Sequence, residues 1–195
     1  PLMRTANRPL LCALVTATLA ASAFAVQPAT LATASVGSGS VTSLQIAGQN
    51  GVPSDATSAL VNLTVLRGVN RGWLTLYPCG EAIPLASNLN YEPNESARTN
   101  AAISRIGAGG KVCIYASTRV ELVVDLTGWT QPGSGVTAIT PSRLVDSRNG
   151  TGGVSRLSAN STATVVVAGA GGVAGGAIGA ALNVTATAAS SAGVL

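Results

Sequence analysis

The chain has 195 residues and a formal net charge of +4, and only 9% of its residues are charged and 3% aromatic. This length allows one or two small domains with a packed core. The low charge argues against a disordered acidic or basic tail, and the scattered Arg residues argue against nucleic-acid binding, which requires a clustered basic face. The absence of His excludes a Ser-His-Asp triad, a Cys-His pair and a His-ligated metal within this chain.

Residues 1–25 have the features of a secretory signal peptide. The stretch begins with two Arg residues, continues with an apolar run from Leu10 to Ala21 and ends in the small-x-small triplet Ala23-Phe24-Ala25. We therefore expect cleavage before Val26. An N-terminal membrane anchor is the less favoured alternative, because the run is short for a membrane span and no basic stop-transfer cluster follows it.

A block of about thirty-four residues occurs twice in the chain. Residues 41–74 and 162–195 match without a gap at an offset of 121 residues, and ten positions are identical. A gap-free match of this length predicts two copies of one structural unit. We therefore expect a flexible spacer over 26–40, a β module over 41–130, a linker over 131–135 and a second β module over 136–195. The second copy stops at Leu195, the counterpart of Leu74, so we expect the chain to be a fragment with a truncated second module.

Short stretches of alternating apolar residues between Gly- and Pro-containing turns predict β-strands. The expected strands are 41–47, 59–66, 72–77, 84–91, 99–106, 111–116 and 120–127. In the second of these, alternate apolar residues share one face, and residues 180–186 repeat that pattern in the second copy. The sequence thus predicts an all-β fold of antiparallel β-sandwich-like modules in tandem. A jelly-roll or barrel variant remains open.

Export would leave two cysteines, Cys79 and Cys113, in an oxidising compartment. An even pair inside one module is most simply joined as a disulfide. Two reduced, buried thiols are the alternative. A zinc site is disfavoured because two Cys residues without His supply too few ligands.

The glycine-rich stretch 165–182 fits the relaxed G-x-G-x-x-G/A dinucleotide fingerprint after an apolar strand. That fingerprint needs a following helix and an acidic residue about twenty positions further on, yet no acid follows Asp146 and the counterpart in the first copy carries Pro53. A membrane helix with small-residue spacing is a second alternative, but the equivalent stretch in the first copy holds polar residues. We therefore predict neither a cofactor nor a membrane span here.

Two carboxylates, Asp125 and Asp146, lie inside apolar runs and need partners there. Arg143, Arg148 or Arg119 can supply them. We predict structural ion pairs in preference to a catalytic role, and we name no catalytic or metal-binding residue. Calcium held by Asp and backbone oxygens stays open as an alternative.

Three aromatic residues are candidates for glycan binding. Trp73 and Tyr77 share one strand face, and Trp129 ends the last strand of the first module. An exposed aromatic face would stack on sugar rings. The alternative is that these residues cover the edge of the core.

Five motifs resemble a tandem repeat of secreted actinobacterial surface proteins. They are Pro141–Arg148 (PSRLVDSR), Gly51–Thr64 (GVP…A…VNLT), Leu74–Pro78 (LTLYP), Ser87–Tyr91 (SNLNY) and Val124–Trp129 (VDLTGW). The resemblance covers nearly all of 41–195 and keeps the motif order. It implies non-catalytic extracellular modules, which are sometimes appended to peptidoglycan hydrolases or proteases.

From this resemblance we expect a secreted, non-enzymatic spacer or adhesive module at the cell wall. One alternative is a carbohydrate-binding module for wall glycans, and another is the accessory region of a wall hydrolase or protease whose catalytic domain lies outside this chain. The expected partners are cell-wall polysaccharide or other surface proteins. We expect no nucleic acid and no stable membrane insertion after signal cleavage.

Overall fold

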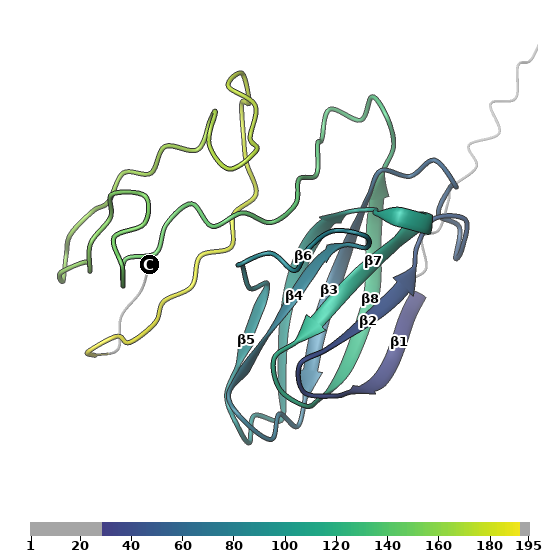
Figure 1. The fold of residues 1–195 in the computed structure, drawn as a ribbon, viewed down its shortest axis with the longest axis horizontal. Helices are drawn as coiled ribbons and strands as arrows, with labels where there is room; N and C mark the ends of the chain where they lie inside the picture. Colours follow the sequence, from purple (N-terminus) through teal and green to yellow (C-terminus); the bar gives the residue numbers. More distant parts are fainter. Residues whose placement is uncertain (1–28, 192–195) are drawn as a thin grey trace, which may run out of the picture.

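The computed structural model describes residues 29–191, and within them eight strands precede a long segment without strands (Figure 1). The expected signal peptide lies outside the described residues. The strands are β1 (Ala29–Val36), β2 (Ser40–Gln45), β3 (Ser58–Leu66), β4 (Gly72–Pro78), β5 (Leu89–Tyr91), β6 (Ala97–Arg105), β7 (Lys111–Ala116) and β8 (Val120–Thr130). A single 3-10 turn, Ala108–Gly110, lies between β6 and β7.

The strands form two four-stranded antiparallel sheets that pack face to face. One sheet has the order β1-β8-β3-β6 and the other β2-β7-β4-β5. The first strand pairs with the eighth, the second with the seventh, the third with the sixth and the fourth with the fifth. Residues 29–130 therefore form one long nested hairpin rolled into a sandwich, which is the jelly-roll arrangement. The predicted all-β sandwich is confirmed, and the barrel alternative is wrong because two separate sheets form.

The core lies between the sheets and follows the predicted alternation. In β3, Ala59, Val61, Leu63 and Val65 are buried, and the intervening residues are half-buried. In β8 the same pattern buries every second residue from Val120 to Leu126. Side chains that alternate along a strand point to opposite faces, so these rows face the other sheet and form one continuous apolar cluster.

The expected flexible spacer over 26–40 is not found in its described part, residues 29–40. Ala29–Val36 forms β1, which pairs with β8, and Ser40 already belongs to β2. Strand formation here comes from the edge of β8, which offers unpaired backbone groups to this stretch. The polar, uncharged composition of the stretch gave no sign of that partner.

The strands expected in the second copy do not form. Residues 179–187 are the counterpart of β3 but contain no strand, and their side chains are exposed. The physical reason is the nested topology, because β2, β3 and β4 all pair with strands drawn from residues 89–130. The sequence holds no second copy of those partner strands, and a strand without neighbours leaves its backbone groups unpaired.

The turn of the repeated block does recur. The backbone N–H of Gly48 donates to the Val52 carbonyl at 3.0 Å, and that of Gly169 donates to the Val173 carbonyl at 3.0 Å. Gly48 and Gly169 have φ values of 78° and 79°, a left-handed conformation that glycine adopts without strain. Local sequence therefore suffices to fold this turn in both copies, whereas the strands also need distant partners.

Candidate functional site

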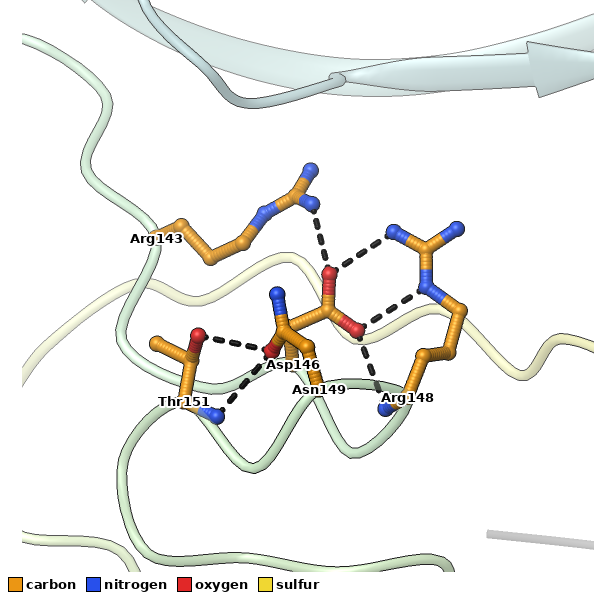
Figure 2. Close-up of polar contacts among 5 residues, drawn as sticks. All are labelled: Arg143, Asp146, Arg148, Asn149 and Thr151. Atoms are coloured by element: carbon orange, nitrogen blue, oxygen red, sulfur yellow. Dashed lines mark hydrogen bonds and ion pairs between the residues drawn. The ribbon is translucent and has the colours of Figure 1, made fainter.

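The most shielded carboxylate in the described chain, Asp146, lies between two guanidinium groups (Figure 2). Arg148 binds it with two hydrogen bonds, from Nε to Oδ1 at 2.9 Å and from Nη2 to Oδ2 at 2.7 Å. Arg143 donates from Nη1 to Oδ2 at 2.9 Å on the other side. The Asp146 side chain is 8% exposed, compared with 29% for Arg143 and 63% for Arg148. Both partners expected from the sequence are therefore in contact with this carboxylate.

The backbone around Asp146 forms a tight turn that brings Arg148 back onto the carboxylate. Asp146 and Thr151 exchange two backbone hydrogen bonds, and the Arg148 N–H donates to Asp146 Oδ1 at 3.1 Å. The Asn149 side-chain oxygen accepts from the N–H and hydroxyl of Thr151 at 3.1 and 2.8 Å (Figure 2). Asp and Asn side chains stabilise turns in this way by replacing backbone acceptors.

These contacts keep Asp146 ionised. The hydrogen bonds from Arg148 lower the pKa of Asp146 well below its usual range, with smaller contributions from the Arg148 charge and from Arg143. In return, the carboxylate raises the pKa of Arg148. A group that exchanges protons during catalysis needs a pKa near the working pH. The arrangement thus suits a structural ion pair that fixes the turn.

Asp125, the other predicted ion-pair residue, lies within β8 and away from this cluster. It is opposite Asn62 on β3 and opposite Thr30 on β1. It is half-buried on a face of its sheet that alternates with the core row. The structure therefore does not bring Asp125 and Asp146 together into a two-carboxylate site.

The three candidate aromatic residues do not form a shared exposed face. Trp73 is 44% exposed on β4, whereas Tyr77 on the same strand is buried against Cys79, Cys113 and Tyr115. Burial raises the pKa of Tyr77. Trp129 belongs to β8 in the other sheet and packs partly buried against the core. The platform that the glycan-binding alternative requires is therefore not assembled from this trio.

Cys79 and Cys113 form the predicted disulfide, with Cα atoms 5.0 Å apart. Cys113 lies in β7 opposite Tyr77, and Cys79 follows the end of β4. The bond therefore joins two neighbouring strands on the outer face of their sheet.

The glycine-rich stretch 165–182 forms turns and irregular backbone. The helix that a dinucleotide-binding site requires after the glycines is not formed there. Over residues 29–191, no helix is long and apolar enough to span a membrane. In the same range, no group of three or more Cys, Asp or Glu side chains is placed to hold a metal ion.

Sequence reasoning missed two polar clusters that join the first module to residues 136–191. In one, Glu81 accepts hydrogen bonds from Arg105 on β6 and from the Thr140 hydroxyl. In the other, the Asn183 amide contacts Asn100 and the backbone next to β5. Neither cluster has a sequence signal, because the contacts that Thr140 and Asn183 make with the first module span between 35 and 96 positions.

Comparison of the chain with protein-family models and with curated proteins finds no match. The structure itself defines the class of protein: an all-β, disulfide-containing jelly-roll sandwich followed by a turn-rich segment.

Proposed function

We propose that this protein is a secreted, non-enzymatic surface module that acts as a spacer or adhesive unit at the cell wall. The observation that carries the proposal is the Cys79–Cys113 disulfide, because such bonds persist in oxidising compartments and are rare in the cytosol. The signal-peptide pattern of residues 1–25 and the resemblance to secreted surface repeats point to the same location. The ionised, doubly paired Asp146 is consistent with a structural role.

An apolar surface on the outer side of the β4 sheet is the best candidate for adhesion. Trp73 is exposed there, and the loop after β4 lies over the same face because Thr75 donates its hydroxyl hydrogen to the Ala86 carbonyl at 2.6 Å. That loop carries Ile83 and Leu85, which are 47% and 81% exposed. Exposed apolar residues that gather into a patch mark interaction surfaces, and these three residues are the candidates for such a patch.

Cell fractionation tests the proposal. The full chain, expressed in an actinobacterial host, should be found in the wall fraction with the N-terminus at Val26 and without free thiols. Leu14→Arg, which places a charge in the apolar run, should keep the protein in the cytoplasm, while Gln49→Arg in an exposed turn should leave export unchanged. A wild-type chain that stays in the cytoplasm with reduced thiols overturns the proposal.

The same fractions test adhesion against a purely spacing role. The double variant Trp73→Ser/Leu85→Ser should move the protein from the wall to the medium. Val69→Ser is the matched control, because Val69 is a similarly exposed apolar residue (66%) in the loop between β3 and β4. If the wild type, the double variant and Val69→Ser are retained equally in the wall, the adhesive surface is wrong and only the spacer role remains.

A further inference from the structure

One side of the sandwich carries one edge strand of each sheet. β6 ends the sheet β1-β8-β3-β6, and β5 ends the sheet β2-β7-β4-β5. Edge strands expose unpaired backbone groups, which natural proteins cover or block. Residues 136–191, called the second unit from here on, contact this side of the sandwich at two places.

The first contact fixes the start of the second unit. Glu81, in the loop after β4, accepts hydrogen bonds from the Thr140 hydroxyl and from the Arg105 guanidinium at the end of β6. Arg105 Nη2 also lies 3.4 Å from Thr140 Oγ1. The bond from Thr140 is the leading cause of the lowered pKa of Glu81, so the carboxylate is ionised while it holds both neighbours.

The second contact fixes a point near the end of the second unit. The Asn183 side chain accepts from Asn100 Nδ2 at 3.1 Å and donates to the Ser87 and Asn88 carbonyls at 3.3 and 3.2 Å. Asn88 is itself anchored, because its side-chain oxygen accepts from the Leu76 N–H of β4 at 2.7 Å. Residues 183–186 and the adjacent parts of β5 and β6 line one surface hollow.

The spacing of these contacts determines how the second unit is held. Arg105 and Asn100 lie five residues apart on β6, which corresponds to about 17 Å along a strand. A single contact would let the second unit rotate in every direction. Two separated contacts leave only rotation about the line that joins them, and the covalent linker over 131–135 restrains that rotation. The short linker over 131–135 keeps the second unit at high effective concentration near this surface.

We propose that β5, β6 and the loop over 79–88 form the docking surface for the second unit, so that the two units are one fixed pair in solution. The proposal rests on the spacer function proposed above and deepens it, because a fixed pair sets a defined length and direction. Docking also covers the open edge and protects it from pairing with other chains.

Distance measurement by electron paramagnetic resonance tests this docking. Spin labels are placed at Gln49→Cys and Ala170→Cys, an exposed and a half-buried residue at equivalent positions of the recurring turn. The labels are carried by the oxidised full chain with the further change Cys12→Ser. A fixed pair gives one narrow distance distribution. The double variant Glu81→Ala/Asn183→Ala should lose that narrow peak, because each exposed polar contact alone contributes little.

Two control variants test whether loss of the narrow peak is specific to the docking contacts. Glu121→Ala on β8 and Asn70→Ala in the loop between β3 and β4 remove the same side-chain types from exposed positions elsewhere and should retain the narrow peak. A broad distribution in the unmodified chain, or an unchanged peak in the double variant, overturns the docking. Loss of the peak on dilution with unlabelled chain also overturns it, because the contact would then join two chains. If the chain fails the fractionation test but gives the narrow peak, the proposed location is wrong and the proposed docking stands.

Discussion

At the scale of single residues, the clearest feature is the carboxylate of Asp146 held between two guanidinium groups. Four donors converge on it, three from Arg148 and one from Arg143. The sequence predicted both partners because a carboxylate inside an apolar run needs a counter-charge. It could not predict the two-pronged geometry, which depends on the turn that Asn149 and Thr151 close.

We predict that Asp146 stays ionised at pH values where ordinary aspartates are protonated. Its pKa is lowered in the folded chain, so its stabilising contribution is complete above the usual Asp pKa of about 3.9 and is lost only as the pH falls through the lower folded value. Carboxyl chemical shifts followed by NMR during acid titration measure this directly.

The variant Arg148→Ala should return the Asp146 pKa most of the way to its usual value, because Arg148 supplies the largest contribution. Arg156→Ala, at an exposed Arg outside the cluster, is the control and should leave the titration unchanged. An Asp146 that titrates at its usual pH in the unmodified chain would contradict the ion-pair cluster.

At the scale of elements, the strands follow from alternation and their pairing is reinforced by one covalent bond. β7 was predicted with its observed bounds, and β3, β4 and β8 to within a few residues at either end. β5 is shorter than expected, because the loop before it is used instead to cover β4, where Ala86 accepts from Thr75 and Asn88 from Leu76. The Cys79–Cys113 bond joins β4 to β7 on the outer face.

We predict that Cys79→Ser/Cys113→Ser lowers the free energy of unfolding by about 3–4 kcal/mol. The reason is that the bond joins residues 34 positions apart and so restricts the unfolded chain. The folded sheets should persist, since the β4–β7 ladder and the core do not depend on the sulfur atoms. Denaturant unfolding of the oxidised protein and of the variant measures the difference. The wild type unfolded in reductant should match the variant. Equal stability in all samples would show that the bond is absent in solution.

At the scale of the whole molecule, the nested topology decides which of the described parts of the chain form strands. Every strand of the first module except β5 pairs with at least one strand distant in sequence. The repeated block supplies only strands from the first half of the nested hairpin, so its second copy has nothing within this sequence to pair with. Equivalent positions of the repeated block are therefore buried in the first copy and exposed in the second.

We predict that two equivalent substitutions have very different effects on stability. Leu63 is fully buried in β3, and its counterpart 121 residues later, Val184, is 73% exposed. Leu63→Ala should cost about 2–5 kcal/mol of unfolding free energy through lost burial and a residual cavity. Val184→Ala should change that free energy by less than about 0.5 kcal/mol. Denaturant unfolding followed by the fluorescence of Trp129, which packs against the core, measures both, and a comparable loss for Val184→Ala would show that the second copy is packed like the first.

The sequence alone determined the features that depend on neighbouring residues: the alternation of β3 and β8, the recurring Gly48 and Gly169 turn, and the Asp146 ion pairs. It also indicated the all-β class and the pairing of two cysteines. Only the tertiary structure decided the strand order, the addition of β1 and the loss of strands in the second copy. It also decided where Tyr77 and Trp129 lie and how Asn183 and Thr140 contact the first module. The physical reason is that a strand is stabilised by its neighbours in the sheet, and in a nested roll those neighbours lie far away along the chain.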